Sequence, residues 1–314
     1  EVKRPVPKDN ELLINIKASA VTNSDIFIRG SKMSFPIIIP FRLMIGVFKP
    51  RKSIIGLVFS GIVKDTGSKI KRFSPGDEVY GMTGFNLSTY AEYTCVKEID
   101  STAGCVSIKP KNISFDAAAL TEPLSGAWKG VVQHSEIEVG ESVVIIGVGS
   151  IGLLCLMVAK AAGAGTLIAV DTSDFAQNNA LSLGADYTFN PEEAYEEIYK
   201  VLPLGPDLVI EAAGPISAVE LMLRLRRRGT RWNVFGITTH EKFELDGGLT
   251  HFLEGRMDAS FGTTPLAMSK AISLMESGLV DTERIISHKL SLDQIDEAVT
   301  IMGEPNRNKV IINP

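Results

Sequence analysis

Three glycines follow an apolar stretch of the chain at a spacing suited to holding a diphosphate. Residues 143–146 read VVII, and the next six, Gly147 to Gly152, read GVGSIG. A GxGxxG pattern between a buried strand and a helix allows a tight turn at Gly147, close backbone approach to a diphosphate at Gly149, and close helix–strand packing at Gly152. Free N–H groups and positive partial charge at the helix start favour an anion there. The stretch predicts a dinucleotide site; the alternative is a glycine turn without a ligand.

An acidic residue follows at the distance that such a site needs. Asp171 ends the next apolar stretch, 19 residues after Gly152. A carboxylate there accepts hydrogen bonds from both ribose hydroxyls and repels a 2′-phosphate, so we expect NAD(H) in preference to NADP(H). Because ligands of such sheets bind at the carboxyl ends of the strands, the expected cofactor-binding residues are Gly147, Gly149, Ser150, Ile151, Gly152, Asp171, Ala212, Ala213, Phe235 and Gly236.

The elements that must position these residues alternate in type along the second half of the chain. From residue 142 onward, short apolar strand patterns are separated by helical patterns, which predicts βαβ units and a parallel sheet with right-handed crossovers. Residues 256–262 are a candidate sixth strand and residues 217–229 a helix. Residues 115–134 also read as a helix. The fold class is therefore α/β, with a doubly wound dinucleotide-binding domain over residues 121–262.

The remaining residues carry short strand patterns separated by turn residues. Strands are expected over residues 11–21, 56–67, 74–81 and 88–96, which describes a compact β-rich domain over residues 1–120. The tail reads as strand, short helix and strand, and we expect residues of about 263–314 to rejoin this first domain.

Composition favours a protein that acts on small molecules. The formal net charge of −5 and the pI near 5.5 argue against a nucleic-acid partner. The basic run at 224–231 ends a predicted helix, where cations complement the helix dipole. Glycines interrupt the apolar stretch after residue 143, so no membrane partner is expected. Three cysteines without CxxC spacing favour a reducing cytoplasm.

The whole chain resembles the medium-chain dehydrogenase/reductase superfamily. The segments that carry the resemblance are KASAVTNSDIFIRG, GLVFSGIV, FSPGDEVYG, TYAEY, GVGSIG and the closing KVIINP. The resemblance implies a GroES-like β-rich catalytic domain joined to a Rossmann domain, and NAD(P)-dependent oxidoreductase activity. It also implies a homodimer that pairs through an edge strand of the Rossmann sheet, here residues 256–262.

The chain departs from the zinc-dependent members of this superfamily. Those members carry a cysteine two residues before a Ser/Thr–Asp pair, and a Gly-His-Glu motif. Here Thr22 stands in place of the cysteine, ahead of Ser24 and Asp25, and Leu57 and Val58 stand in place of the histidine and glutamate. Hydroxyl and alkyl side chains are not zinc ligands.

One acid remains at a position that resembles the metal site of the polyol dehydrogenase branch, namely Glu122 in EPLSGAW. A single glutamate does not replace cysteine and histidine, and the cysteine-rich lobe that holds a structural zinc is also absent. We therefore expect no metal residues and no zinc. The chain resembles the zinc-independent, quinone oxidoreductase-like branch, with polyol- and threonine-dehydrogenase-like features around Glu122 and Asp171.

Without zinc, hydrogen-bond donors must stabilise charge on the substrate oxygen. The expected catalytic residues are Thr22 and Ser24 as donors and Asp25 as an orienting acid; the alternative for the two hydroxyls is capping in a turn. Arg29 is expected to bind substrate or, alternatively, to form a surface ion pair. Leu57 is expected to form an apolar wall, and the substrate-binding set is Arg29, Leu57 and Glu122.

These residues leave three functions open. The first is NADH-dependent reduction of a quinone or an α,β-unsaturated carbonyl, in which a hydride goes to an electron-poor carbon and orientation suffices. The second is an NAD-dependent alcohol or polyol dehydrogenase. The third is a non-enzymatic nucleotide-binding protein, since a fold does not imply a function.

Overall fold

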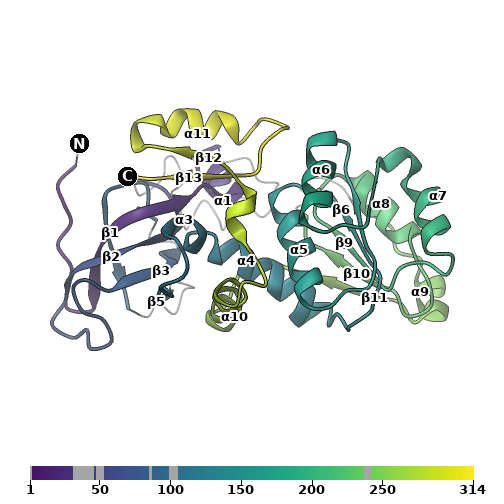
Figure 1. The fold of residues 1–314 in the computed structure, drawn as a ribbon, viewed down its shortest axis with the longest axis horizontal. Coiled ribbons are helices and arrows are strands. Elements are labelled where there is room, and N and C mark those ends of the chain that lie inside the picture. The colour runs from purple at the N-terminus through teal and green to yellow at the C-terminus, as the bar shows by residue number, and fades with distance from the viewer. Residues whose placement is uncertain (1, 31–45, 47–52, 85–86, 99–104, 237–241) are drawn as a thin grey trace. The chain divides into compact units, whose positions relative to one another are not determined.

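The computed structural model describes residues 2–30, 46, 53–84, 87–98, 105–236 and 242–314 (Figure 1). The chain divides into two compact units. The first contains Glu1–Glu122 and Thr264–Pro314, and the second contains Pro123–Thr263. Within the described ranges, no helix is both long enough and apolar enough to cross a lipid bilayer.

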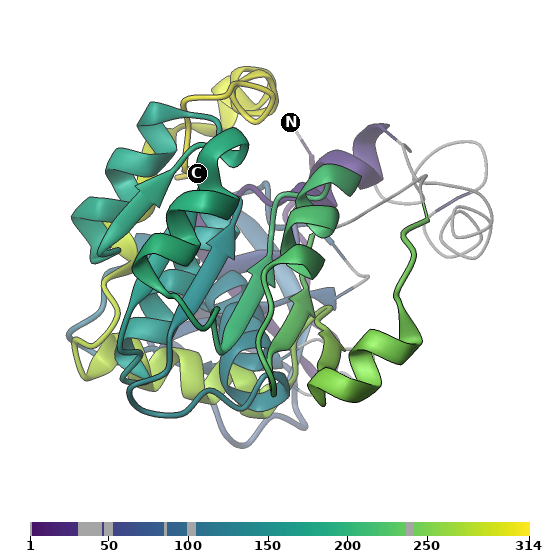
Figure 2. The ribbon, with the colours of Figure 1, turned by 90° about the vertical axis from the view of Figure 1, so that its right-hand side faces the viewer.

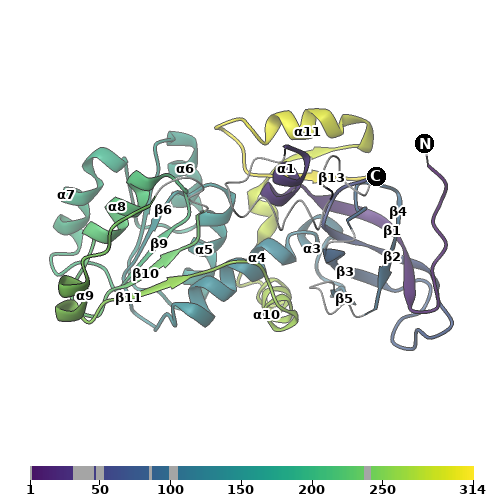
Figure 3. The ribbon, with the colours of Figure 1, turned by 180° about the vertical axis from the view of Figure 1, so that it is seen from behind.

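The first unit is built on a mainly antiparallel sheet with the order β12-β13-β1-β2-β3-β5, in which β4 also pairs with β1 (Figure 3). The tail therefore adds β12 and β13 beside the first strand of the chain. The strands are β1 Glu11–Ala20, β2 Val58–Thr66, β3 Glu78–Met82, β4 Tyr93–Lys97, β5 Cys105–Ile108, β12 Ile286–Leu290 and β13 Lys309–Ile312. The helices are α1 Asn23–Gly30, α3 Phe115–Ala118, α10 Pro265–Glu276 and α11 Ile295–Ile301, with 3₁₀ turns at Thr282–Ile285 and Leu292–Gln294.

Alternation of side chains explains the core of this unit. Leu12, Ile14 and Ile16 occupy every second position of β1 and are buried with Phe59 and Val63 of β2, as expected when successive side chains of a strand point to opposite faces. On the other side, α11 packs over β13 and buries a second cluster. Strand β1 therefore pairs with β13, from the other end of the chain, as well as with β2 and β4.

The second unit is a Rossmann fold, which confirms the predicted α/β class. Its described strands form one parallel sheet in the order β11-β10-β9-β6-β7-β8, with helices on both faces (Figure 2). The strands are β6 Val143–Ile146, β7 Leu167–Val170, β8 Tyr187–Phe189, β9 Leu208–Glu211, β10 Arg231–Val234 and β11 Arg256–Ala259. The helices are α5 Ser150–Ala161, α6 Asp174–Leu183, α7 Pro191–Val201, α8 Ile216–Arg224 and α9 Gly247–Leu253.

The chain order in this sheet reverses between β6 and β9. In doubly wound sheets such a reversal opens a crevice at the carboxyl ends of the strands, where ligands bind. Strands β6, β7 and β9 are buried along their whole length, which explains why their sequences, apart from Glu211 at the end of β9, are apolar throughout rather than alternating. The segment after β6 is the glycine-rich stretch.

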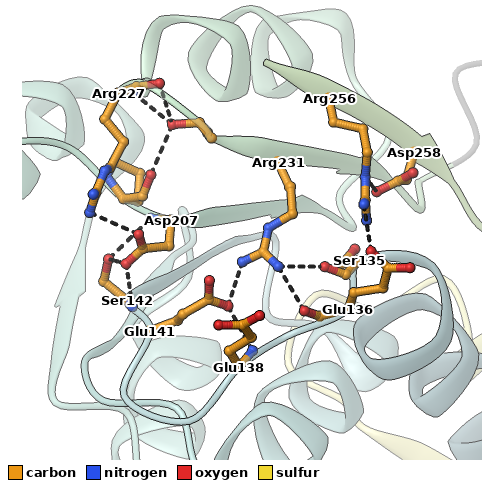
Figure 4. Close-up of polar contacts among 12 residues, drawn as sticks. Ser135, Glu136, Glu138, Glu141, Ser142, Asp207, Arg227, Arg231, Arg256 and Asp258 are labelled. Carbon is orange, nitrogen blue, oxygen red and sulfur yellow. Dashed lines mark hydrogen bonds and ion pairs between the residues drawn. The ribbon is translucent and has the colours of Figure 1, made fainter. Parts of the chain in front are cut away.

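A network of charged side chains lies at the opposite, amino-terminal edge of the same sheet (Figure 4). Asp207, just before β9, accepts hydrogen bonds from the backbone N–H and the hydroxyl of Ser142 and forms an ion pair of 2.8 Å with Arg227. Arg231, at the start of β10, pairs with Glu141. The basic run of the sequence is therefore matched by acids within its own unit.

Some expected elements differ from the observed ones. The strand expected over 88–96 is observed only as β4, and the helix expected over 217–229 ends at Arg224 because the next residue turns to an extended conformation. The expected helix over 115–134 is broken into α3, α4 Thr121–Trp128 and a π-helical turn at Lys129–His134. Helix α1, helix α9 and strand β5 were not predicted, since each is short and lacks a clear hydrophobic period.

Candidate functional site

The glycine-rich turn joins β6, one of the two strands at which the Rossmann sheet reverses, to α5. Gly147 follows β6 with a φ of +85°, a left-handed conformation that favours glycine. A methyl group added at Gly147 would lie 2.6 Å from Cβ of Ala213, which follows β9. The turn and the segment after β9 are therefore in direct contact at the predicted ligand crevice.

The other two glycines of the motif differ in their surroundings. A methyl group at Gly152 would lie 1.9 Å from the carbonyl oxygen of Gly147, so the first turn of α5 packs on the glycine turn, backbone against backbone. At Gly149, by contrast, a methyl group would meet no atom of the described chain within 4 Å. The space in front of Gly149 is open, as close approach of a ligand requires.

The start of α5 presents unused hydrogen-bond donors. The first bond of the helix joins Leu153 N to Gly149 O at 2.9 Å, so the preceding N–H groups of Ser150 and Ile151 have no partner within the helix. The hydroxyl of Ser150 is buried and has no hydrogen-bond partner among the described residues. A phosphate oxygen at this helix start would satisfy these donors, so the residues fit a dinucleotide.

Asp171 lies at the end of β7 and contacts the glycine turn. Its Oδ2 accepts a hydrogen bond of 2.9 Å from Val148 N, and its Oδ1 accepts one of 3.0 Å from Ser173 N. The side chain is half-buried, and each carboxylate oxygen retains capacity for a further bond. The carboxylate thus orients the glycine turn and can still accept hydrogen bonds from a ribose.

Sequence reasoning missed a buried acid, Glu211, at the end of β9. Its Oε1 accepts hydrogen bonds from Ala213 N at 2.7 Å and Gly214 N at 2.6 Å. Burial raises the pKa of Glu211, and the backbone donors of Gly214, Ala213 and Gly236 oppose that rise. Glu211 therefore ties together the segments after β9 and β10. An acid that ends an apolar strand just before a glycine was the available signal.

The remaining predicted cofactor residues lie on these two segments. Ala212 and Gly236 are half-buried and Ala213 is exposed. The ring of Phe235 packs instead against the helical segment before β6, where a methyl group at Gly130 would lie 2.8 Å from Phe235 Cε2. A cofactor contact of Phe235 would therefore involve its backbone more readily than its ring.

In the first unit, Thr22 and Asp25 cap helix α1. The Thr22 hydroxyl donates to Asp25 Oδ2 at 2.7 Å, and Thr22 N donates to the same oxygen at 2.9 Å. Asp25 N returns a bond of 3.3 Å to Thr22 Oγ1. This reciprocal arrangement is a capping box with aspartate as the acid, so the hydroxyl proton of Thr22 points to Asp25.

The other predicted substrate-side residues are dispersed. Ser24 is exposed. Arg29 forms an ion pair of 2.8 Å with Asp296, the alternative that the sequence left open. Leu57 is half-buried, and its carbonyl oxygen accepts a bond of 2.8 Å from Thr83 N. The structure joins Thr22 and Asp25 by hydrogen bonds, and among the described residues no side-chain hydrogen bond or ion pair links either of them to Ser24 or Arg29.

Among the described residues, three buried or half-buried ionisable groups interact with Asp25, namely Tyr90, Glu122 and Lys309, and sequence reasoning missed Lys309. Burial raises the pKa of Asp25, and hydrogen bonds from Thr22 and the charge of Lys309 partly offset the rise. Burial likewise raises the pKa of Glu122, against the charge of Lys309. Burial and the neighbouring Asp25 carboxylate raise the pKa of Tyr90. The Tyr90 hydroxyl and Asp25 Oδ1 nevertheless form no hydrogen bond of good geometry with each other or with any other described residue.

Lys309 is the cation of this cluster. Burial lowers its pKa to about 8, and the negative charge of Glu122 is the main influence that opposes this lowering. A lysine at the start of a buried strand, in KVIINP, was the signal that could have identified it, because lysine is almost never fully buried without a reason.

The donors near Thr22 do not fit zinc. Thr22, Leu57 and Val58 stand where zinc-dependent members carry ligands, and among the described residues no three His, Cys, Asp or Glu side chains are grouped to hold a metal ion. The segment 31–52 lies largely outside the described residues, but its sequence contains none of these four residue types. Zinc requires thiolate, imidazole or several carboxylate ligands.

Two family models match the chain. The alcohol dehydrogenase GroES-like domain matches residues 8–109, within the first unit. The zinc-binding dehydrogenase model matches residues 150–277, which cover the Rossmann helices and strands from α5 onward and extend into α10.

Curated relatives match over nearly the whole chain. L-threonine 3-dehydrogenase of Bacillus velezensis is 27% identical, with 100% of this chain and 94% of the relative covered. Sorbitol dehydrogenase of Bacillus subtilis is 26% identical, with 94% of this chain and 88% of the relative covered.

Solved structures are similar in fold over the same length. A protein of Sinorhizobium meliloti, described as a zinc-binding dehydrogenase and solved with NADP, is 26% identical with a TM-score of 0.86, covering 100% of this chain and 94% of that one. Alcohol dehydrogenase TADH from Thermus sp. ATN1 is 24% identical with a TM-score of 0.86, covering 100% and 95%.

Proposed function

Since the chain belongs to the medium-chain dehydrogenase/reductase superfamily and is an oxidoreductase, we propose that it interconverts a small secondary alcohol and its ketone with NAD(H). The substrate class is a polyol or amino alcohol. The Rossmann unit binds the nucleotide, and the GroES-like unit supplies the groups that handle the substrate proton. When bound, the nicotinamide supplies or accepts the hydride.

The observation that carries this proposal is the similarity of the whole chain to enzymes of one chemical type. The relatives are named for threonine, sorbitol, arabitol phosphate and xylulose. All four names denote hydroxylated compounds of low molecular mass. This similarity favours alcohol oxidation over the reduction of quinones or enones, which the missing zinc ligands alone had favoured.

Preference for NAD(H) is supported by Asp171. Its carboxylate is half-buried and already accepts one hydrogen bond on each oxygen, so a 2′-phosphate placed beside it would meet uncompensated negative charge. The Sinorhizobium relative, by contrast, was solved with NADP.

Reaction without zinc is supported by the side chains at the former ligand positions. The Thr22 hydroxyl donates a hydrogen bond to Asp25, and the side chains of Leu57 and Val58 are alkyl groups. We propose that this chain performs the reaction with hydrogen bonds and fixed charge in place of a Lewis acid.

Reduction of a quinone or enone is the second candidate, and the same two apolar residues favour it. A planar, electron-poor ring needs an apolar surface and an oriented hydride more than a strong electrophile. Leu57 and Val58 would provide part of such a surface.

A paired screen separates these candidates. Chelator-treated protein is given NAD⁺ with sorbitol, D-arabitol, L-threonine and 2,3-butanediol, and separately NADH with benzoquinone and short enones. We expect turnover in the alcohol panel. Turnover confined to the quinone and enone panel would replace the first candidate with the second.

A further inference from the structure

Two lysines of the first unit are almost completely buried, and they differ in their partners. Lys109 is 5% exposed, pairs with Glu78 at 2.9 Å and donates to the carbonyl oxygens of Pro110 and Ile113. Lys309 is 4% exposed, yet none of the ion pairs within 4.0 Å in the described part of the chain involves it. The first lysine is held in structure, whereas the second keeps its ammonium group uncommitted.

Strand pairing places Lys309 beside the start of α1. Strands β1 and β13 are antiparallel, with Ala20 opposite Ile311, and Val21 N donates to Val310 O at 2.9 Å. Strand β1 ends at Ala20, and continuing this register by one residue beyond Val21 and Val310 sets Thr22 opposite Lys309, the first residue of β13. The uncommitted cation thus lies next to the position where zinc-dependent members carry a metal ligand.

Acidic groups face Lys309 from two helices. Asp25 of α1 is 1% exposed, and its Oδ1 has no hydrogen-bond partner among the described residues. Glu122 of α4 is half-buried and interacts electrostatically with both Lys309 and Asp25. Other ionisable groups on neighbouring elements include Tyr90, Arg307 and, on β12, His288 and Lys289.

We propose that Lys309 is the proton-transfer residue of the reaction and that its ammonium group replaces the metal as the positive charge beside the substrate oxygen. This inference rests on the proposed function. In the oxidation direction, the carbinol carbon loses a hydride to the nicotinamide while the neutral amine of Lys309 takes the hydroxyl proton, leaving a ketone and an ammonium ion. In reduction, the ammonium returns that proton to the oxygen as the carbon gains the hydride.

The physical basis is the strength of charge at low dielectric. A buried cation stabilises a developing alkoxide far more than the same cation in water. A proton-transfer group works best when its pKa lies near the working pH, and burial brings the pKa of Lys309 to about 8. Glu122 and Asp25 keep the protonated form accessible, as the two carboxylates favour a nearby positive charge.

The kinetic test uses Lys309→Met, Lys309→Gln and Lys309→Arg, with Lys289→Met as the matched control. Lys289 is exposed and pairs with Asp116. For the best substrate of the alcohol panel, we expect kcat/KM of the wild type to rise with pH through about 8. In the Met and Gln variants, kcat/KM should fall roughly 10²–10⁴-fold, and its pH profile should lose the inflection. Their affinity for NADH should stay unchanged.

A direct test needs no turnover. Competitive labelling of the wild type with acetic anhydride, followed by mass spectrometry, reports the pH at which each lysine loses its proton. We expect Lys309 to become reactive near pH 8. Lys289 should react only at higher pH, because its hydrogen bond to Asp116 raises its pKa.

The outcomes separate this inference from the proposed function. Retention of the wild-type kcat/KM and pH inflection by Lys309→Met and Lys309→Gln would overturn the role of Lys309 and leave the dehydrogenase standing. Labelling of Lys309 only in the range of Lys289 would do the same, even if a variant failed to fold. A wild type that binds NADH but turns over no alcohol would overturn the proposed function, and the role of Lys309 with it.

Discussion

At the scale of a single residue, the proposed preference for NAD(H) depends on Asp171. Its position at the end of the second strand was predicted from its distance to the glycine motif, since the geometry of a βαβ unit fixes where that strand ends. Its hydrogen bond with the glycine turn was not predictable, because the bond from Val148 N to Asp171 Oδ2 joins positions 23 residues apart in the chain.

We predict that Asp171→Asn weakens NADH binding about 10-fold to 100-fold and narrows the difference between NADH and NADPH. The reason is that charge-assisted bonds to the ribose hydroxyls contribute about 1.5–3 kcal/mol. Asparagine keeps an acceptor oxygen, so the turn should be preserved. Titration calorimetry with both nucleotides measures the change, and Asp174→Asn, on the exposed first turn of α6, is the control. Equal affinity of the wild type for both nucleotides would contradict the assignment.

The lowered pKa of Lys309 also leads us to predict how the free energy of unfolding depends on pH. A lysine has a pKa of 10.5 when unfolded and about 8 here, so below pH 8 folding carries the full penalty of the buried charge, about 3 kcal/mol. Between pH 8 and 10.5 the folded protein releases the proton while the unfolded chain keeps it, and stability rises with pH.

Lys309→Met should therefore leave the free energy of unfolding at pH 7 unchanged or raise it by about 1–3 kcal/mol, and that gain should fade above pH 8. Lys109→Met should instead lose about 2–4 kcal/mol, because two buried carbonyl oxygens lose their donor. Urea denaturation at pH 7 and pH 10 measures both variants. An equal loss for the two would mean that Lys309 serves stability.

Residues such as Lys309 and Glu211 mark the limit of sequence reasoning. Each is the terminal residue of an apolar strand, and sequence alone does not distinguish a solvated strand end from a buried one. The deciding contacts join positions far apart in the chain, from β1 to β13 and from Glu211 to Gly236. Long-range pairing of this kind has no local signature.

At the scale of elements, the start of α5 was the most predictable part of the site. A strand, a glycine turn and a helix have strong local patterns, and each glycine has its own physical reason. Helix α1 was missed although Thr22 and Asp25 stand three residues apart in a capping-box spacing. The sequence left capping by Thr22 open as an alternative but did not indicate the helix that it caps, because the usual acid of a capping box is glutamate or glutamine.

Two alanine substitutions test the glycine turn. Gly149→Ala should keep the stability of the wild type, since no atom of the described residues lies within 4 Å of the added methyl group, yet it should weaken NADH binding at least about 10-fold by filling the diphosphate position. Gly152→Ala should lower the free energy of unfolding by about 2–3 kcal/mol, because its methyl group would meet Gly147 O at 1.9 Å. Gly247→Ala, also in open space, is the control for thermal unfolding and NADH titration. Undiminished NADH binding by Gly149→Ala would place the diphosphate elsewhere.

At the scale of the whole molecule, the parallel sheet ends at β11. Among the described strands, β11 pairs only with β10, and Phe261 just beyond it is 87% exposed. Unpaired edges with exposed apolar side chains promote association.

We predict a homodimer with twice the 34.0 kDa mass of one chain. Light scattering coupled to gel filtration measures the mass, and Phe261→Lys should shift the protein toward the monomer. A monomeric wild type at micromolar concentration would contradict the prediction.

Metal-free turnover tests the central claim most directly. Protein stripped with a strong chelator and assayed for zinc by mass spectrometry is given NAD⁺ and the alcohol panel, and nicotinamide absorbance is followed. We predict ketone formation at a rate that added Zn²⁺ does not increase. Activity that is absent after stripping and returns with one equivalent of Zn²⁺ would contradict the account.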